Sequence, residues 1–461
     1  MVNFYGRTQI FADVDKITEE NVLRVVRNAY VTHLKNAYEI QYLYDYYRGK
    51  QPVYEREKEI RPEICHKIVE NWANAIVSFK VGYLCASPVQ YVSGKSQKDL
   101  TKSIDILNDI MDSHGKASVD KDLIEWQMIC GTSFRSIFSD DTEDISIDSL
   151  NPLNTFVIYS NDIKQTPLAG VYVSLKYEKS KEVKYWTVYT PEKVFTIRAK
   201  SIVQTAENGL GDIPIKEYPA NNARLSVIEI VIDLLNAIND LDSNRLDGVE
   251  QFIQSLLVVY NADIGEETAN TLREKGLIAL KSTNDCNADI KIISEQLDQN
   301  QTQTLKEDLI QRVREIVGLP AQGDGNSSDS SNNGAMLLKG GWENAETRAR
   351  ETEVMFKKSE IPFLKLLFRI LDKKGLVTLD VADVDIRFTR RNYENILVKS
   401  QVLTTMLSND KIEPKLAFQS CGLFIDPEEA YRESMEYYGR IEQSDEPNNG
   451  DVGKNNGQTE E

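Results

Sequence analysis

Three oxygen-bearing side chains stand at the spacing of a calcium-binding loop. Asp240, Asp242 and Asn244 occupy its first, third and fifth positions, where ligands alternate along the chain. The sixth position, where a sharp turn needs glycine, is Arg245, and the twelfth, where a bidentate glutamate is needed, is Gln251. The pattern therefore favours a solvated or interface face of a helix over a calcium site.

Two other groups of carboxylates could serve a metal-dependent nuclease or phosphotransferase, which is the enzymatic alternative. Asp380, Asp383 and Asp385 lie among alternating apolar residues, which favours a turn between two strands. The second group favours a solvated turn and consists of Asp140, Asp141, Glu143 and Asp144. We expect neither group to bind a metal.

A Gly-Lys-Ser sequence at residues 94–96 follows a predicted strand and precedes a predicted helix, which is the setting of a phosphate-binding loop. The first glycine of that motif would stand where the chain has Val89, so the cradle of backbone amides is not encoded and a turn is favoured. His33, His66 and His114 have no partner at catalytic or metal-binding spacing. The sequence therefore predicts no enzyme and no cofactor.

The net charge restricts how the protein could meet nucleic acid. The 461 residues include 54 Lys and Arg against 72 Asp and Glu, a net charge of −18. This composition argues against a broad basic surface, and a protein needs such a surface to bind the phosphates of nucleic acid tightly. Tyr42, Tyr44, Tyr46 and Tyr47 therefore favour packing between subunits or domains over stacking on bases. A DNA partner would stay unbound and mobile.

The cysteines and the apolar runs bear on the compartment. The five cysteines are odd in number, widely spaced and never form Cys-x-x-Cys, which argues against disulfides and zinc and fits a reducing compartment. We see no signal-peptide pattern and no run near the roughly 18 apolar residues that a membrane span needs. We expect a protein made in the cytosol, with about three structural units at this length.

The first half of the chain changes from helical to strand periodicity. Apolar residues three to four apart predict helices over residues 18–48, 62–84, 98–113 and 118–130, with a short strand at 88–93. Pro62 would begin the second helix, in which Cys65 is a core residue and His66 a boundary residue. Alternation then predicts an antiparallel sheet over residues 133–139, 154–160, 169–177, 183–190 and 193–199.

Helical periodicity returns at residues 228–256, followed by a compact αβ insertion over 257–298. Thr304 and Glu307 form a capping box that predicts the start of the next helix, and Gly318 and Pro320 predict its end. The later segments are one long helix over 335–371 with kinks at Gly340-Gly341 and Pro362, a strand pair over 376–388, and helices over 397–408, 414–421 and 427–441, the last capped by Asp426.

Residues 321–334, AQGDGNSSDSSNNG, have no aromatic residue, no aliphatic residue larger than alanine, and neither Lys nor Arg. Such a segment cannot pack a core. Its composition alone fits a plain flexible linker, but the long predicted helices on both sides favour a loop held at its two ends.

Read in order, several segments resemble the portal protein family of long-tailed phages that infect Gram-positive bacteria. The resemblance covers nearly the whole chain, and the order and spacing of the segments carry it more than any single motif. The segments are YLYDYYRGKQPV, KIVENWANAIVSFKVGYLCASPVQY, KYWTVYTPEKVFTI, IPIKEYPANNARLSVIEIVIDLLNAINDLDSN and VGLPAQGDGNSSDSSNNGAMLLKGGWENAETRARE.

The resemblance implies a mixed α+β portal fold that forms a ring, twelve copies in the family. Residues 1–224 and 335–396 would form the wing, 225–256 and 299–320 the stem, 257–298 the clip and 397–441 the crown. Residues 442–461 would be a disordered acidic tail. Residues 321–334 would be the tunnel loop. Family members often have Ser-Gly-x-Ala-Leu after this loop, whereas this chain has Asn333-Gly334-Ala335-Met336-Leu337.

The resemblance also implies a role and partners. The ring would stand at the portal vertex of the virion after assembly in the host cytoplasm. It would pass double-stranded DNA without sequence specificity and contact the terminase large subunit, head-completion or adaptor proteins, and capsid and scaffolding proteins, but no membrane. A capsid-associated adaptor without a channel remains the alternative. The loop facing the DNA would comprise Gln322, Gly323, Asp324, Gly325, Asn326, Ser327, Ser328, Asp329, Ser330, Ser331, Asn332 and Asn333.

Two features of this loop fit that role. Asp324 and Asp329 would repel the phosphates, so that a duplex slides without a deep electrostatic trap. Gly323, Gly325 and Gly334 would let the loop change shape as a helical duplex moves through the ring.

Overall fold

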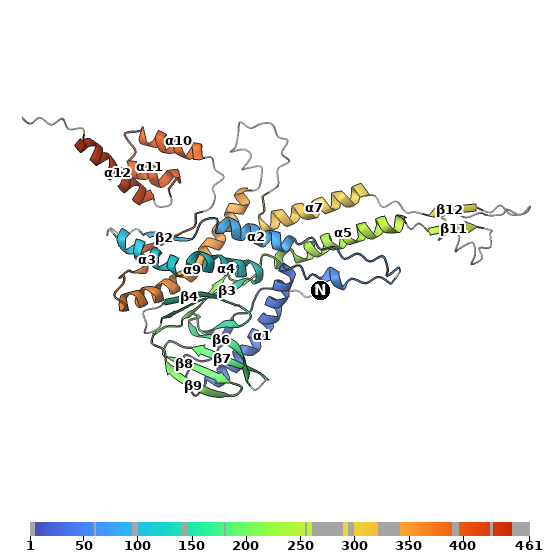
Figure 1. The fold of residues 1–461 in the computed structure, drawn as a ribbon, viewed down its shortest axis with the longest axis horizontal. Coiled ribbons are helices and arrows are strands. Elements are labelled where there is room, and N and C mark those ends of the chain that lie inside the picture. Colours follow the sequence, from blue (N-terminus) through green and yellow to red (C-terminus); the bar gives the residue numbers. More distant parts are fainter. Residues whose placement is uncertain are drawn as a thin grey trace, which may run out of the picture.

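The computed structural model describes residues 5–59, 61–94, 100–139, 145–178, 181–253, 256–260, 289–293, 299–320, 342–389, 396–424 and 427–444. In Figure 1, the long helices α5 (Ile232–Ile253) and α7 (Gln299–Val317) project from a body of sheets and helices. The C-terminal helices lie at the opposite end of the molecule. The mixture of helices and several sheets agrees with the predicted fold class.

The largest sheet has the strand order β1-β5-β6-β7-β8-β9 and is antiparallel, as predicted, except that β1 runs parallel to β5. Helix α1 (Val22–Tyr47) packs on this sheet through its buried stripe, with Val22 and Val26 in one core with Phe156 and Val188. Strand β9 was not predicted, because its residues are almost all exposed and show no alternation. The strands are β1 (Ile10–Ala12), β5 (Thr155–Ser160), β6 (Pro167–Glu178), β7 (Lys181–Tyr189), β8 (Lys193–Arg198) and β9 (Ser201–Glu207).

A second, three-stranded sheet has the order β10-β3-β4, with β10 (Ile215–Pro219), β3 (Thr132–Ser139) and β4 (Ile145–Leu150). The prediction of one sheet is therefore wrong for residues 133–139, because alternation predicts a strand but not the strand with which it pairs. The helices α3 (Thr101–Ser113) and α4 (Lys116–Cys130) confirm two predicted helices. Gly131 joins α4 to β3 at a φ of +81°, and a Cβ there would lie 2.0 Å from the carbonyl oxygen of Arg224. Only glycine fits this close crossing.

The predicted helix over residues 62–84 is wrong in its first half, since α2 spans Trp72–Leu84 alone. The segment before it, which includes Cys65 and His66, is irregular and lies along α5. The amides of His66, Ile68 and Glu70 donate to side chains of α5 instead of to their own helix: Asp247 Oδ1 (2.8 Å), Ser243 Oγ (3.0 Å) and Asn239 Oδ1 (2.8 Å).

The spacing of these three bonds explains their regularity. Four residues of a helix rise about 6 Å, and two residues of an extended chain rise about 6.6 Å. Every fourth side chain of α5 therefore meets every second amide of the segment. These contacts compensate for the helical hydrogen bonds that the segment gives up.

The predicted strand pair over residues 376–388 is also wrong. Only β13 (Val384–Arg387) forms, and it pairs with β2 (Gln90–Ser93) from far earlier in the chain. The 3-10 turn η3 (Val381–Asp383) precedes it, where the side chains of Asp380 and Asp383 make a reciprocal capping box. The expectation of a turn at these carboxylates is confirmed, but it does not join two strands.

Helices α5 and α7 confirm the two predicted helices of the projection, although α7 begins at Gln299 and not at a Thr304 cap. Thr304 lies inside the helix, where its hydroxyl donates to the carbonyl of Asn300 (2.9 Å). Beyond the helices, β11 (Leu256–Tyr260) pairs with β12 (Asp289–Ile293), which confirms the first and last strands expected in the insertion. Its residues 261–288 lie outside the described residues.

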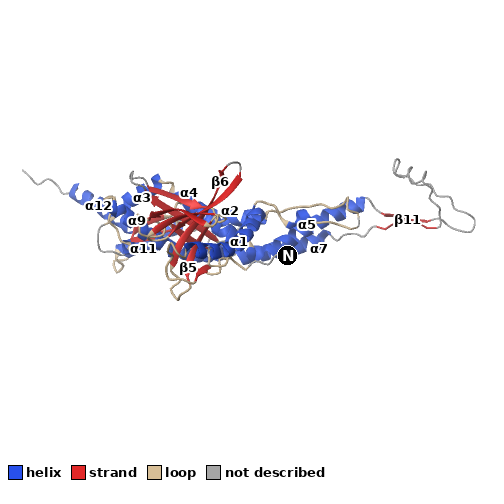
Figure 2. Cartoon of the chain, turned by 90° about the horizontal axis from the view of Figure 1, so that it is seen from below, coloured by secondary structure: helices blue, strands red, loops and turns tan. Residues whose placement is uncertain are grey.

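The long helix α9 (Trp342–Lys373) runs without a break through Pro362, and the predicted kink point at Gly340-Gly341 lies outside the described residues. The three C-terminal helices α10 (Ile396–Leu407), α11 (Pro414–Cys421) and α12 (Pro427–Ser444) confirm their predictions. The cap at Asp426 and the tail from residue 445 lie outside the described residues. In the view of Figure 2, the strands of the larger sheets gather in the body, α5 and α7 extend away from it, and β11 lies beyond these helices.

Candidate functional site

The twelve predicted loop residues, Gln322 to Asn333, lie outside the described residues, but the structure describes both helices that flank them. The end of α7 and the start of α9 touch. Asn344 Nδ2 donates to the carbonyl of Glu315 (3.0 Å). Gly318, which ends α7 at a φ of +70°, lies so near α9 that a Cβ would be 3.0 Å from Arg348 Cγ. The chain therefore leaves and re-enters the body at neighbouring points.

Helix α2 braces both ends of this junction. The guanidinium of Arg314, near the end of α7, lies 5.6 Å from the ring centre of Trp72. At the start of α9, Trp342 lies 6.1 Å and 5.9 Å from the ring centres of Phe79 and Tyr83. Aromatic contacts of this kind fix both position and direction. The junction is thus anchored on one rigid helix of the body.

A shared ammonium holds the projecting helices to each other. Lys306 of α7 contacts Asp242 of α5 at 3.0 Å and also Glu70 of the segment before α2. Burial and the neighbouring Glu70 carboxylate raise the pKa of Asp242. Arg245 of α5 donates to Gln303 of α7 (2.7 Å). The base of the projection is therefore cross-linked by polar contacts.

The carboxylate of Asp247 on α5 accepts from four donors. Besides the His66 amide, they are Arg56 Nη1 (2.7 Å), Lys58 Nζ (2.5 Å) and His66 Nδ1 (2.9 Å). Burial alone would raise the pKa of Asp247, but the hydrogen bonds from His66, Lys58 and Arg56 together lower it below its ordinary range. This carboxylate ties residues 56–66 to the projection.

The C-terminal half of α9 is anchored by a buried carboxylate. Glu360 receives hydrogen bonds from Arg135 of β3, Tyr91 of β2 (2.6 Å) and Tyr218 of β10 (2.7 Å). Arg135 also pairs with Asp120, which Lys116 contacts in turn. Burial raises the pKa of both tyrosines well above the ordinary value, so they stay donors. Three sheet strands thus converge on one side chain of α9.

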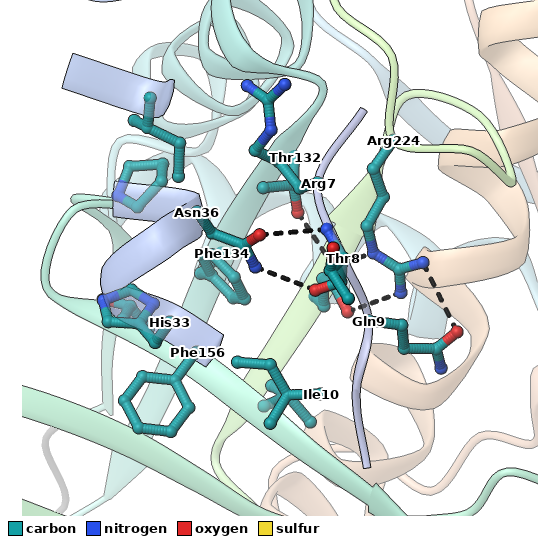
Figure 3. A pocket seen from close by; sticks show the side chains of 15 residues that line it. Arg7, Thr8, Gln9, Ile10, His33, Asn36, Thr132, Phe134, Phe156 and Arg224 are labelled. Atoms are coloured by element: carbon teal, nitrogen blue, oxygen red, sulfur yellow. Dashed lines mark hydrogen bonds and ion pairs between the residues drawn. The ribbon is translucent and has the colours of Figure 1, made fainter. Parts of the chain in front are cut away.

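Figure 3 shows a small cavity beneath the N-terminal segment, lined by Arg7, Thr8, Asn36 and Arg224 among others. Its volume of about 20 Å³ suits a single water molecule. Asn36 satisfies both backbone groups of Thr8, accepting from the amide (2.9 Å) and donating to the carbonyl (2.8 Å). The cavity is a packing feature under a tightly held strand and has no room for a substrate.

The other candidate residues are dispersed. Asp240 and Asn244 are exposed on α5 while Asp242 is buried against Lys306, so the expected solvated or interface face is split. Within the described ranges, no three His, Cys, Asp or Glu side chains are grouped to hold a metal. The acidic group at residues 140–144 and most of the Gly-Lys-Ser sequence lie outside the described residues.

Histidines and tyrosines mainly serve packing. His33 is buried, stacks on Phe156 and contacts the carbonyl of Leu153 (2.9 Å). His66 is half-exposed, as expected for a boundary residue, whereas Cys65 is only partly buried and is not the core residue that was predicted. The packing role of the tyrosines is confirmed within the chain: Tyr46 donates to Asn236 of α5 (2.9 Å) and Tyr47 to Glu125 of α4 (3.0 Å).

The residues that do most to position α5 and α9 were not among the predicted site residues. Asn239, Ser243 and Asp247 recur every fourth residue on the buried side of α5, and this recurrence is the signal that could have revealed a partner segment. Glu360 stands directly before the apolar run IPFLKLLF, which marks it as a buried charge in need of partners.

These elements define a structural subunit in which the long helices α5 and α7 project from a body of sheets and helices, and in which α7 and α9 meet at their ends. The chain belongs to the family described as phage portal protein, SPP1 Gp6-like, whose sequence profile matches residues 30–446. Among solved structures it is similar to a chain from the "Neck of empty GTA particle computed with C6 symmetry", with 10% identity and a TM-score of 0.43, covering 77% of this chain and 90% of that one. No curated protein matches it by sequence. Of the helices in the described ranges, none is long and apolar enough to cross a membrane.

Proposed function

We propose that this protein is the subunit of a portal ring, the conduit through which DNA enters and leaves a phage capsid. In this assignment α1 to α4, the two larger sheets and α9 form the wing, and α5 and α7 form the stem. The insertion with β11 and β12 is the clip, α10 to α12 are the crown, and residues 322–333 are the tunnel loop facing the DNA. The ring would comprise twelve copies, as in the family.

The observation that carries the proposal is the junction of α7 and α9. Because these helices touch at Asn344 and Glu315, residues 321–341 begin and end at one place on the body. A segment whose ends lie so close together would protrude as a loop, and the polar composition of residues 321–334 supports this because it offers no side chains for a core. A loop whose two ends are anchored by α7 and α9 suits a segment that contacts moving DNA.

The charge of the chain supports a conduit over a clamp. Twelve copies at −18 would carry roughly 200 negative charges, which disfavour adhesion of phosphates to the ring. Asp324 and Asp329 would place carboxylates near the axis. DNA would then pass without sequence specificity and without a strong resting position.

Partners follow from the same assignment. At the portal vertex of the virion, the clip would receive the terminase large subunit during packaging and head-completion or adaptor proteins afterwards. The wing and crown would meet capsid and scaffolding proteins during assembly in the host cytoplasm. ATP hydrolysis would belong to the terminase.

Electron microscopy of the purified full-length chain tests this function. We expect top views to show a closed ring with a central pore and twelve-fold symmetry. Gold or a bulky label attached at residue 327 should lie at the pore and not at the outer rim. A chain that stays monomeric under all assembly conditions, or an assembly without a pore, would favour the adaptor without a channel.

A further inference from the structure

Helix α1 has a solvent face that differs from the rest of this acidic chain. Its inner stripe packs on the six-stranded sheet, but Val31, Leu34 and Tyr38 are 57%, 48% and 64% exposed. At 100° per residue these three positions lie within one narrow arc, so they form a continuous apolar stripe. A soluble monomer gains nothing from aligned exposed apolar residues of this size.

Three cations extend and border the same stripe. Arg24, Arg27 and Lys35 are exposed and fall within the same arc of about 100° as the apolar residues. None of them pairs with a carboxylate anywhere in the described part of the chain. The solvent face of α1 is therefore a basic and apolar surface about 21 Å long, on a chain whose net charge is −18.

Helix α3 presents the opposite combination. Asp105, Asp109 and Asp112 are exposed on one side of it, together with Ile106, which is 44% exposed. Neither Asp105 nor Asp109 has an ion-pair partner among the residues that the structure describes, and Lys102 is the one cation on this side of the helix. This acidic surface is about 10 Å long, so it would face about half of the stripe on α1.

We propose that the solvent face of α1 in one subunit packs against the solvent face of α3 in the neighbouring copy. The two surfaces carry opposite charge, and each also exposes apolar side chains, Val31, Leu34 and Tyr38 on α1 and Ile106 on α3. The inference deepens the proposed ring and rests on it, because it names the surfaces through which neighbouring copies meet.

The charges also select the symmetry of the contact. A two-fold dimer that paired α1 with α1, or α3 with α3, would bring three like charges together. A head-to-tail contact pairs opposite charges instead, and repeated around an axis it closes a ring. The same residues would therefore favour a cyclic assembly and disfavour an isolated symmetric dimer.

Charge reversal of each helix separately tests the contact in the full-length chain. The first variant is R24E/R27E/K35E and the second is D105K/D109K/D112K. At low ionic strength we expect each alone to raise the concentration needed for half-assembly by about ten-fold or more. Reversal of three exposed lysines elsewhere, K200E/K358E/K365E, changes the net charge as much as the first variant and should leave assembly unchanged.

Restored complementarity provides the decisive measurement. An equimolar mixture of the two variants, and one chain carrying all six substitutions, should both recover rings, because opposite charges face each other again. Circular dichroism confirms that each variant is folded before assembly is scored. As a second readout, chains carrying only L34C mixed with chains carrying only I106C should give disulfide-linked dimers above the wild-type background.

The outcomes separate this inference from the proposed function. Wild-type rings that persist in both reversed variants would overturn the contact between α1 and α3 and leave the portal assignment intact. The contact would also be overturned if the variants with one reversed helix are folded but neither their mixture nor the chain with all six substitutions recovers rings. A wild-type chain that never forms a ring would overturn the proposed function and this contact together.

Discussion

Arg135 Nη1 lies 2.8 Å and 2.9 Å from the two carboxylate oxygens of Glu360, and both side chains are almost completely buried. The tyrosines of β2 and β10 complete the environment of the carboxylate, so its position along α9 is set by three strands at once. A helix held in this way cannot slide or turn in the body without leaving a buried charge unpaired. If the segment before α9 moves, the displacement of α9 would therefore be confined to the start of this helix.

Glu360→Gln tests this anchor. The amide keeps the size of the side chain but leaves Arg135 as a buried cation with only Asp120 as an ionic partner. We expect the free energy of unfolding to fall by about 3–5 kcal/mol, measured by chemical denaturation. The control Glu353→Gln removes a more exposed pair with Lys357 on the same helix and should cost less than about 1 kcal/mol. Equal effects of the two substitutions would contradict the anchor.

His33 gives the fold a defined sensitivity to acid. Burial lowers its pKa to about 4, although the hydrogen bond to the Leu153 carbonyl acts in the opposite direction. In the unfolded chain an ordinary histidine binds its proton near pH 6.5, so between pH 6.5 and pH 4 the unfolded chain holds more protons. The free energy of unfolding should therefore fall with pH across this window, by about 3 kcal/mol from His33 alone.

The variant His33→Gln isolates this contribution, because its amide can still donate to Leu153 but does not titrate. Denaturation at a series of pH values should show a smaller loss of stability in the variant than in the wild type between pH 6.5 and pH 4. At pH 8 the two proteins should differ mainly by the lost stacking on Phe156. Parallel pH profiles would show that folding does not lower the pKa of His33, so that His33 takes up its proton in the folded protein as it does in the unfolded chain.

The extents of most helices and strands follow from local patterns, but several contacts that position them do not. The stripe of Val22, Val25 and Val26 predicts α1 because burial on one sheet needs only a helical period. Residues 62–71 have a similar period, yet they do not form a helix, because side chains almost two hundred residues later bond their amides. Sequence periodicity has no access to a competitor so far along the chain.

The candidate site divides in the same way. Gly318 predicts the end of α7 because positive φ is a local requirement. The meeting of α7 with α9 depends on Asn344 and Arg348, whose types carry no signal for a contact with residues 315–318. The strand pair predicted over 376–388 is wrong because β13 pairs with β2, which lies far earlier in the chain, and not with its own neighbour in sequence.

Asp247→Ala tests the segment that lies along α5. Without this carboxylate the His66 amide loses its acceptor, and Arg56 and Lys58 lose an ionic partner. We expect amide hydrogen exchange of residues 66–70 to speed up by about thirty-fold, equivalent to about 2 kcal/mol. The control Asp240→Ala removes an exposed carboxylate of the same helix and should leave these amides unchanged. Unaltered protection in the Asp247 variant would show that Asn239 and Ser243 suffice.

Trp342→Ala tests the brace at the loop exit. The substitution removes the contacts with Phe79 and Tyr83, each of the order of 0.5–1.5 kcal/mol. We expect faster amide exchange in the first turns of α9, up to about residue 350, with the region around Glu360 unchanged. Tyr437→Ala, which truncates an exposed aromatic residue of α12, serves as the control. Loosening that spreads along the whole of α9 would contradict independent anchoring of its two halves.

The proposed tunnel loop, residues 322–333, yields a prediction that depends on charge alone. If Asp324 and Asp329 keep the duplex from adhering, replacing both with Lys would place about twenty-four cations near the axis of a twelve-fold ring and create a phosphate trap. We expect slower DNA translocation in a packaging reaction with the cognate terminase, with the defect shrinking as salt is raised. Replacing both with Asn removes the repulsion without adding attraction, so this variant should lie between the wild type and the lysine variant. Equal packaging rates for all three proteins at low salt would contradict this prediction. Either the loop would then not approach the DNA, or its charge would not govern the passage of DNA. Cross-linking from residue 327 to the packaged duplex decides between these two explanations.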